Sequence, residues 1–161
     1  MLWLLGEIID SFQVDNRPGV GLPLGNLTSQ LLVNVYMNEF DQFIKRELKE
    51  KYYIRYADDF VIVSESRAWL EYQLPKITTY LIVKLKLSLH PRKVSIKTFV
   101  SGIDFLGWVH FPHRRVLRTA TKRRMMRRLH ANTSDETVIS YRGLLSHGNS
   151  HKLKQKFFFL L

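Results

Sequence analysis

The sequence contains no cysteine in 161 residues, which excludes a disulfide scaffold, a zinc–thiolate site and a thiol nucleophile. This absence fits a reducing compartment. Long apolar runs are absent too, since Met1–Leu5 and Phe157–Leu161 fall far short of the roughly 20 residues in a membrane-spanning helix. Residues 1–9 also lack the basic segment of a signal peptide. We therefore expect a soluble, cytoplasmic protein that does not bind a membrane.

Acidic residues are scarce in the second part of the chain. Residues 1–90 hold 10 Lys/Arg and 11 Asp/Glu, a net charge of −1. Residues 91–161 hold 15 Lys/Arg and 3 Asp/Glu, a net charge of +12, so they carry the whole excess of +11. A basic part beside a balanced part indicates a polyanionic partner. Nucleic acid is favoured over an acidic membrane surface because no strongly amphipathic helix stands out.

Hydrophobic spacing predicts a mixture of helices and strands. Two prolines and three glycines in ten residues make Arg17–Asn26 a loop. Pro75 is expected to kink its helix or to end it early. The predicted helices cover residues 2–12, 28–51, 66–80, 119–130 and 138–145, and the predicted strands cover residues 52–54, 60–63, 85–89, 94–97 and 103–111. This order predicts an α+β fold with a basic helical lobe appended.

Asp58 and Asp59 form an adjacent carboxylate pair between two β-prone runs, Tyr52–Ile54 and Phe60–Val63. Two neighbouring carboxylates on a tight hairpin repel each other unless a cation neutralises them. Oxygen ligands on a rigid turn suit Mg²⁺, which keeps other positions for water and phosphate. Two such ions can activate a hydroxyl and stabilise a leaving pyrophosphate. A solvated Asp-Asp turn is the alternative, because aspartate is common in turns.

The tetrapeptide Tyr-Ala-Asp-Asp at residues 56–59 resembles the Tyr-x-Asp-Asp catalytic hairpin of reverse transcriptases. Upstream, Gly21–Tyr36 resembles the family's preceding motif, a glycine loop that runs into the helix flooring the nucleotide site. In group II intron and retron enzymes this motif reads Gln-Gly-x-x-x-Ser-Pro, whereas Leu24–Gln30 reads Leu-Gly-Asn-Leu-Thr-Ser-Gln. Leucine in place of glutamine and glutamine in place of proline are similar to the reverse transcriptases of diversity-generating retroelements. The resemblance continues in order to the basic tail and covers nearly the whole chain.

The resemblance implies a fold and an activity. A partial polymerase palm is expected over residues 1–111, with an antiparallel sheet that carries the catalytic hairpin and with helices on one face. Residues 112–161 are expected to form a basic, mainly helical thumb segment. The implied activity is RNA-directed DNA polymerisation with Mg²⁺, or Mn²⁺, as cofactor. The implied partners are an RNA template, a DNA primer, deoxynucleoside triphosphates and, as in relatives of this type, an accessory protein.

The resemblance also implies roles for residues around the hairpin. Asp58 and Asp59 would be catalytic and would hold the metal. Gly25, Gln30 and Tyr56 would bind the nucleotide, because glycine lets the backbone approach closely and an amide both donates and accepts hydrogen bonds. An ordinary turn glycine and a plain helix-start residue are the alternatives for Gly25 and Gln30.

Further roles are implied toward the end of the chain. Lys93 would face the triphosphate and protonate the departing pyrophosphate. From Arg114 to Arg128 there are eight basic residues and no acid, a pattern that suits sequence-tolerant contact with phosphates. For Lys93 the alternative is a solvated strand end, and for Trp108 it is a position in the core. For the basic run Arg114–Arg128 the alternative is a face that is only exposed to solvent. The residues expected on the template–primer hybrid are Gly107, Trp108, Arg118, Lys122, Arg123 and Arg127.

Polymerase chemistry needs a further carboxylate on a neighbouring strand. Glu7, Asp10 and Asp15 are the only acids before the glycine loop, and none stands in a strand pattern. We therefore expect this polypeptide to be inactive alone and to be part of a longer active enzyme. Three alternatives stay open: a group II intron-like reverse transcriptase or maturase, a catalytically silent RNA-binding remnant, and a basic helical module that docks an acidic protein.

Overall fold

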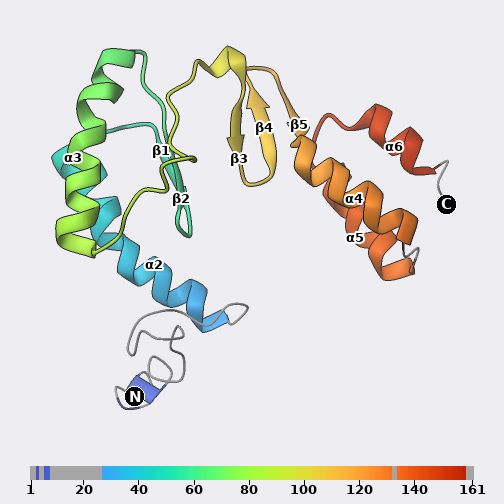
Figure 1. The fold of residues 1–161 in the computed structure, drawn as a ribbon, viewed down its shortest axis with the longest axis horizontal. Helices are drawn as coiled ribbons and strands as arrows, with labels where there is room; N and C mark the ends of the chain where they lie inside the picture. The colour runs from blue at the N-terminus through green and yellow to red at the C-terminus, as the bar shows by residue number, and fades with distance from the viewer. Residues whose placement is uncertain (1–2, 4–5, 8–26, 132–133, 159–161) are drawn as a thin grey trace. The chain divides into compact units, whose positions relative to one another are not determined.

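The computed structural model describes Trp3, Gly6, Glu7 and residues 27–131 and 134–158, which are drawn as a coloured ribbon in Figure 1. The chain divides into two units, Met1–Leu89 and His90–Leu161. Only three residues of the helix predicted over residues 2–12 are described, and all three are helical. The loop predicted over residues 17–26 lies outside the described residues.

From Leu27 on, the first unit starts with a long helix. Helix α2 (Leu27–Gln42) continues directly as a π-helix (Phe43–Glu47). The prediction of a helix over residues 28–51 is therefore confirmed, although the helix ends earlier. Its buried residues are Met37, Phe40, Phe43 and Ile44.

A hairpin follows this helix. Strands β1 (Tyr53–Tyr56) and β2 (Asp59–Ile62) pair in antiparallel register, as the sequence predicts. Tyr53, Phe60 and Ile62 pack against the buried residues of the helices, and the Phe40 and Phe60 rings meet edge to face with centroids 4.9 Å apart. The hairpin thus has one face covered by helices (Figure 1).

Helix α3 (Arg67–Leu85) completes the core of the first unit. Ser66 caps its first turn, because the Ser66 hydroxyl accepts a hydrogen bond from the amide of Trp69 at 3.1 Å. The helix predicted over residues 66–80 is confirmed. Of the two outcomes expected at Pro75, the early end is wrong, since the helix passes through Pro75 and runs on to Leu85, and the kink stays a prediction.

The strand predicted over residues 85–89 is wrong. Leu85 is the last residue of α3, and it is buried together with Ile77 and Leu81, which precede it at helical spacing. Lys86 then takes a left-handed conformation with φ 52°, and the amide of Leu87 donates to the carbonyl of Leu81, which ends the helix. Leucines at 85, 87 and 89 fit a strand period, but burial of Leu85 on the helix decides the outcome.

The second unit contains a three-stranded antiparallel sheet in the order β3-β4-β5. Its strands are β3 (Ile103–Phe105), β4 (Trp108–Phe111) and β5 (Arg114–Leu117), preceded by a 3-10 turn at Phe99–Ser101. The strands predicted within residues 103–111 are confirmed as the β3–β4 hairpin. The strand predicted over residues 94–97 is wrong, because these residues form neither helix nor strand.

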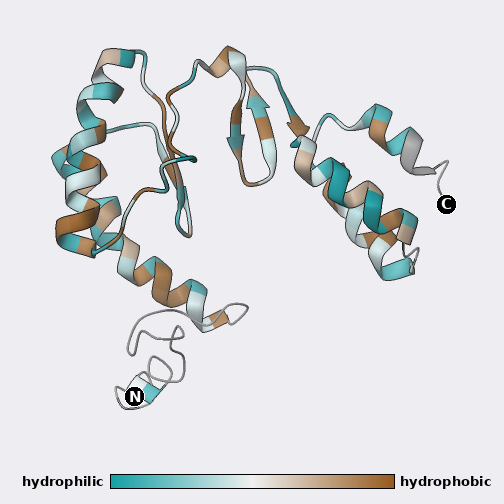
Figure 2. Ribbon diagram, viewed as in Figure 1, coloured by the Kyte–Doolittle hydropathy of each residue, from teal (hydrophilic) through white to brown (hydrophobic). Residues whose placement is uncertain are grey.

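After the sheet, the described residues of the second unit form three helices. They are α4 (Thr119–Ala131), α5 (Asp135–Ser146) and α6 (His151–Phe158). The basic helix predicted over residues 119–130 and the helix predicted over residues 138–145 are both confirmed, and α4 carries strongly hydrophilic stretches (Figure 2). A separate small core holds these helices together, made of Met125, Leu129 and Leu145.

The mixture of helices and small antiparallel sheets confirms the predicted α+β fold class. The division of the family's palm and thumb between Phe111 and Pro112 stays a prediction. None of the described helices is long and apolar enough to cross a membrane.

Candidate active-site hairpin

Asp58 and Asp59 lie at the tip of the β1–β2 hairpin. Tyr56 pairs with Asp59, so Ala57 and Asp58 form a two-residue loop. Both aspartates are exposed, and within the described part of the chain no hydrogen bond or ion pair engages either carboxylate. The tip therefore presents two adjacent carboxylates to solvent.

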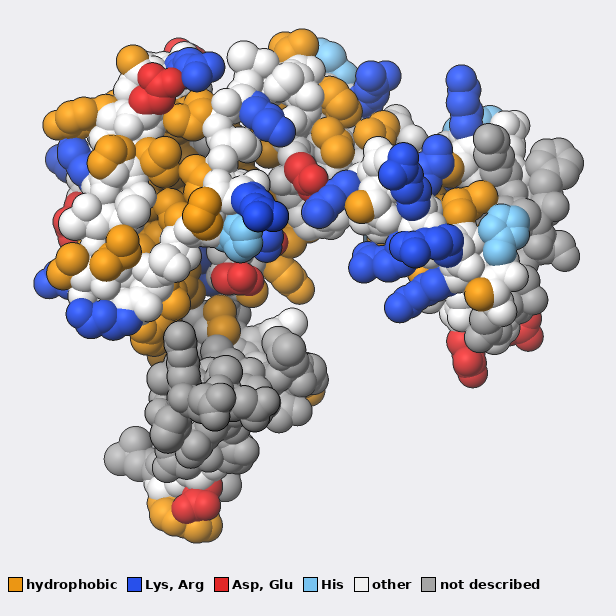
Figure 3. Space-filling model, in the orientation of Figure 1, with side chains coloured by type: hydrophobic (Ala, Val, Ile, Leu, Met, Phe, Trp, Pro, Cys, Tyr) orange, Lys and Arg blue, Asp and Glu red, His pale blue; other side chains and the backbone are white. Residues whose placement is uncertain are grey.

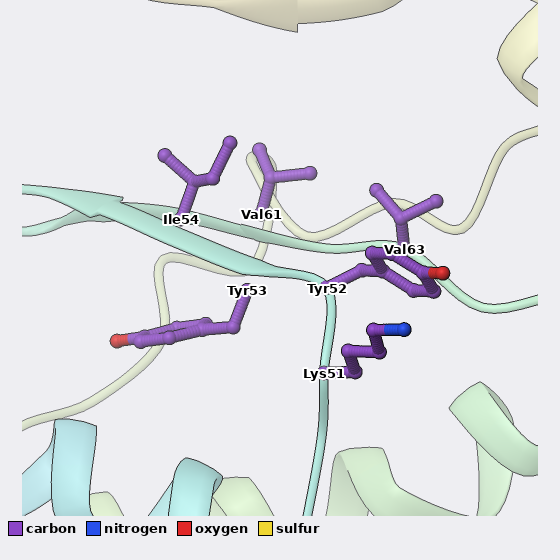
Figure 4. A pocket seen from close by; sticks show the side chains of 6 residues that line it. All are labelled: Lys51, Tyr52, Tyr53, Ile54, Val61 and Val63. Carbon is purple, nitrogen blue, oxygen red and sulfur yellow. The ribbon is translucent and has the colours of Figure 1, made fainter.

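The two faces of the hairpin differ. Figure 4 shows Tyr53 pointing toward the helices, whereas Ile54, Val61 and Val63 point to the opposite face. A shallow hollow of about 320 Å³ lies beside these residues at the open end of the hairpin, away from the aspartates. The hollow is therefore separate from the carboxylate site.

Tyr56 is exposed and pairs with Asp59, so it lies beside the candidate metal ligands.

The loop has an unusual backbone conformation. Ala57 has φ 51°, in the left-handed region that costs a non-glycine residue about 1 kcal/mol. Two-residue hairpin loops use positive φ because it matches the twist of the strands. A strained alanine at such a position is held by its surroundings.

Arg55 lies behind this loop and reaches it directly. Its Nη1 donates a hydrogen bond to the carbonyl of Ala57 at 2.8 Å. Its Nε and Nη2 donate to Oδ1 and Oδ2 of Asp41 at 2.8 and 2.6 Å, a two-pronged ion pair with helix α2. The Arg55 side chain is only 9% exposed. The hairpin tip is thus tied to α2 through one guanidinium group.

Tyr53 joins the same network, since its hydroxyl donates to Oδ1 of Asp41 at 2.7 Å. The hydrogen bond from Arg55 holds the pKa of Asp41 below its usual range. The same hydrogen bond raises the pKa of Arg55. Burial, reinforced by the hydrogen bond to Asp41, raises the pKa of Tyr53. All three groups therefore keep their ordinary charge at neutral pH, with Asp41 and Arg55 ionised and Tyr53 neutral.

Asp41 and Arg55 were not among the site residues predicted from the sequence. The sequence does contain a signal for Arg55. Side chains alternate between the two faces of a strand, so Arg55 points inward between the outward-facing Ile54 and Tyr56. A charge on an inward face needs a partner. Nothing in the local pattern identifies Asp41 as that partner, because it lies 14 positions earlier on another element.

Among the residues predicted to bind the nucleotide, Gly25 lies outside the described residues. Gln30 is exposed in the first turn of α2. Asn34, one helical turn further on, accepts a hydrogen bond from Nη1 of Arg55 at 3.2 Å. Residues four apart share one side of a helix, so Gln30 lies on the side of α2 that meets the hairpin. Its role in nucleotide binding stays a prediction.

Lys93 belongs to the second unit, where it lies in an exposed turn rather than at the end of a strand. Its amide donates to the carbonyl of His90 at 2.9 Å. Its role toward the triphosphate stays a prediction.

Gly107 lies in the β3–β4 loop with φ 82°, after Leu106 with φ 53°. The amide of Arg118 donates to the carbonyl of Gly107 at 3.0 Å, and the Arg118 guanidinium pairs with Asp104 at 3.2 Å. The start of α4 is thereby bonded to the β3–β4 hairpin, whose Gly107 and Trp108 are expected to contact the template–primer hybrid.

Trp108 follows this loop, and its ring is buried, 8% exposed. The ring packs against Gly148, where an added Cβ would come within 2.1 Å of it, and the Arg115 guanidinium lies 5.5 Å from its centroid. These contacts support a structural role for Trp108, and contact with a primer stays a prediction.

Basic side chains gather over α4 in Figure 3. Met125 and Leu129 turn to the core of the second unit, which leaves the basic side chains outside. Asp104 neutralises part of the charge on Arg118. The exposed basic residues predicted to contact a hybrid are Arg118, Lys122, Arg123 and Arg127.

The hairpin alone supplies part of a metal site. Carboxylate oxygens are suitable ligands for Mg²⁺, which needs only one or two of them when phosphates and water complete its coordination. Nowhere in the described ranges do three or more His, Cys, Asp or Glu side chains gather closely enough to hold a metal ion. Asp58 and Asp59 therefore fit as two ligands of a site that needs others.

Comparison with known proteins found one family match. The model of a family described as reverse transcriptase (RNA-dependent DNA polymerase) matches residues 13–110. This range includes α2, the carboxylate hairpin, α3 and the β3–β4 loop, and it ends before α4. No curated protein matches the chain.

Proposed function

The chain belongs to the reverse transcriptase family, and on that premise we propose that it contributes the metal-binding hairpin to RNA-directed DNA synthesis. The observation that carries this proposal is the exposed pair Asp58 and Asp59 at the tip of the hairpin, whose carboxylates have no other partners within the described residues. Aspartates that served only to cap a turn would be bonded to nearby backbone. These are available to a cation.

Asp58 and Asp59 would hold Mg²⁺ or Mn²⁺. A metal bound there supplies charge neutralisation at phosphate oxygens and lowers the pKa of an attacking hydroxyl. The nucleotide would be bound by Gly25, Gln30 and Tyr56. Lys93 would supply a proton to the leaving pyrophosphate. Ser29–Gln30, in place of Ser-Pro, favours the diversity-generating retroelement type over a group II intron-like enzyme.

The second unit would hold the template–primer hybrid. An RNA–DNA hybrid is A-form-like and is bound mostly through its backbone, for which exposed arginine and lysine on one helix are suited. Gly107 and Trp108 would contribute at the β3–β4 loop. Palm and thumb would meet between Phe111 and Pro112, inside the β4–β5 connection.

The proposal is tested by Mn²⁺ binding, measured by electron paramagnetic resonance on the whole chain. Changes in groups that only support a ligand alter metal affinity about 10-fold. Asp58→Asn with Asp59→Asn is therefore expected to weaken Mn²⁺ binding by at least that factor. Glu65→Gln removes an exposed acid outside the hairpin and should leave the affinity unchanged. Equal affinity in all three proteins would overturn the proposal.

Nucleic-acid binding separates the second candidate function from the first. If the chain binds an RNA–DNA hybrid but shows no aspartate-dependent Mn²⁺ site, it is a silent RNA-binding remnant. The basic surface of α4 is the observation that favours this alternative.

We also propose that the chain does not extend a primer by itself, since no third carboxylate joins the pair within the described residues. Primer extension on an RNA template, with the Asp58→Asn variant as control, tests this. Extension that depends on Asp58 would refute it.

A further inference from the structure

Arg55 makes more hydrogen bonds than its ion pair with Asp41 requires. Four of its five N–H groups are used: two on Asp41, one on Asn34 and one on the carbonyl of Ala57. Asp41 and Asn34 both belong to α2, whereas Ala57 belongs to the loop. A single planar group therefore fixes the distance between the helix and the tip of the hairpin.

The bond to Ala57 acts on the peptide that carries Asp58. The carbonyl of Ala57 and the amide of Asp58 form one rigid planar unit. A hydrogen bond to that carbonyl therefore sets the orientation of the peptide and the direction in which the chain enters Asp58. Asp59 follows directly and is fixed by its pairing with Tyr56, so the position of the Asp58 carboxylate relative to that of Asp59 depends on this peptide.

The conformation of Ala57 makes such a restraint necessary. With φ 51°, Ala57 occupies a region that alanine rarely adopts unless its surroundings impose it. Arg55 is nearly buried and held by a two-pronged contact, so it is a rigid donor rather than a flexible surface side chain. The loop is thus held in a strained form by a buried anchor.

We propose that Arg55, oriented by Asp41, is a positioning residue that holds the Ala57–Asp58 peptide so that Asp58 and Asp59 are presented together to a divalent cation. The proposal rests on the metal-binding function proposed above. Arg55 does not touch the metal, and it acts through the backbone of the loop. Because Arg55 also bonds Asn34, it links the carboxylates to the side of α2 that carries Gln30.

The test uses the whole chain and two matched pairs of substitutions. Asp41→Asn with Arg55→Gln removes both charges of the anchor, so that no buried charge is left unpaired. Arg67→Gln with Glu71→Gln removes an exposed ion pair on α3 and serves as control. Two quantities are measured: Mn²⁺ affinity, and the hydrogen-exchange rate of the Asp58 and Asp59 amides relative to the amides of α3.

Outer-shell groups typically change metal affinity by about 10-fold, and the same loss is expected when the anchor pair is removed. The loop amides should exchange faster while those of α3 do not. Adding Ala57→Gly should recover much of the affinity, because glycine adopts positive φ without strain. Arg55→Lys should behave like the anchor variant, since lysine lacks the planar fork that reaches Asp41 and Ala57 at once.

The outcomes separate this proposal from the function on which it rests. If the folded anchor variant keeps both its Mn²⁺ affinity and its loop protection, Arg55 is not a positioning residue, while the metal site stands. If the wild-type chain shows no Mn²⁺ binding that depends on Asp58 and Asp59, the metal function is refuted and the presentation of ligands by Arg55 is refuted with it. Faster loop exchange would then support only the restraint of Ala57. If the anchor variant loses Mn²⁺ affinity and Ala57→Gly restores it, the result supports both the metal site and the positioning role of Arg55.

Discussion

Asp41 stabilises the first unit only while it is ionised. It accepts hydrogen bonds from Tyr53 and Arg55, and the bond from Arg55 lowers its pKa below the ordinary value of 3.8. A carboxyl group whose pKa is lowered by folding contributes stability that is fully present above its unfolded pKa and is lost as the pH falls through its folded pKa. The Asp41 contribution is therefore constant near neutrality and disappears in acid below pH 3.8.

This behaviour predicts a pH-dependent cost for Asp41→Asn. At pH 6 the variant should lose about 2 kcal/mol of unfolding free energy, because hydrogen bonds to charged groups are worth about 1.5–3 kcal/mol. The difference from wild type should shrink as the pH falls below 3.8, where wild-type Asp41 also becomes neutral. Urea unfolding, followed through amide signals of the first unit, measures it. A difference that is the same at every pH would contradict the role of the charge.

Gly148 packs against a ring that leaves no room for a side chain. An added Cβ would lie 2.1 Å from the six-membered ring of Trp108, and the next residue, Asn149, exchanges two hydrogen bonds with Arg115 on β5. Gly148→Ala should therefore destabilise the second unit by roughly 1–3 kcal/mol, the usual cost of overpacking. Denaturation followed through amides of α5 measures the effect.

The control for this change is Gly143→Ala, because Gly143 lies within α5 with open space around its Cα. Alanine should stabilise the helix there by up to about 1 kcal/mol. Trp108→Leu should make the cost of Gly148→Ala smaller, since it removes the ring that the new methyl group meets. Equal costs in both backgrounds would show that the ring is not the cause.

The carboxylates and their supports were not equally predictable from the sequence. Asp58 and Asp59 follow a β-prone run at a predicted hairpin, a feature that local patterns predict well, and the structure has Asp58 in the two-residue loop and Asp59 at the start of β2. The Arg55–Asp41 pair depends on how a strand packs on a helix 14 residues away, and local patterns do not contain that information. The same holds for Gly148 and Trp108, which are 40 positions apart in sequence and in contact in space.

At the scale of elements, helix α3 keeps a proline in its interior. Pro75 has no amide hydrogen, so the carbonyl of Glu71 lacks its helical donor, and proline in a helix interior is about 3 kcal/mol less favourable than alanine. The helix persists because Ile77, Leu81 and Leu85 are buried in the core of the first unit. Packing therefore overrides the local preference that predicted an early break.

Pro75→Ala should accordingly stabilise the first unit by about 1–3 kcal/mol, the lower end allowing for relaxation around the proline. Pro75 is exposed, so alanine leaves no cavity. Thermal unfolding followed through α3 amides gives the measurement. Thr79→Ala, on the exposed side of the same helix, should give only a few tenths of a kcal/mol. A loss of stability on replacing Pro75 would mean that the proline ring makes packing contacts that outweigh the missing hydrogen bond.

Element types followed the sequence at the helices and at the two hairpins, and they failed at residues 85–89 and 94–97. The spacing over α2 extends across several turns and identifies this helix. Residues 85–89 offer only three leucines, which fit a strand period, but Leu85 is buried as the last residue of helix α3. Strand β5 was not predicted, because its alternation is obscured by Arg114 and Arg115.

At the scale of the whole molecule, the carboxylate pair and the basic surface belong to different units of the chain. The first unit carries the carboxylate pair and has nearly balanced charge, whereas the second unit has a net charge of +12, from 15 Lys/Arg and 3 Asp/Glu. Each unit has its own core, with Phe40 at 0% exposure in one and Leu145 at 1% in the other. Metal binding and hybrid binding should therefore respond to different core substitutions.

Phe40→Ala should cost about 3–5 kcal/mol in the first unit and Leu145→Ala about 2–5 kcal/mol in the second. Because the Phe40 ring packs on Phe60 of the carboxylate hairpin, its loss should weaken Mn²⁺ binding and leave the affinity for an RNA–DNA hybrid unchanged. Leu145→Ala should do the opposite, and it should flatten the salt dependence of hybrid binding, since that slope reflects the number of phosphates contacted by basic residues. Mn²⁺ titration and hybrid binding at several salt concentrations measure both effects. If each substitution lowered both affinities by similar factors, the two activities would share one cooperative structure, and assigning the cation to the hairpin and the hybrid to α4 would be wrong.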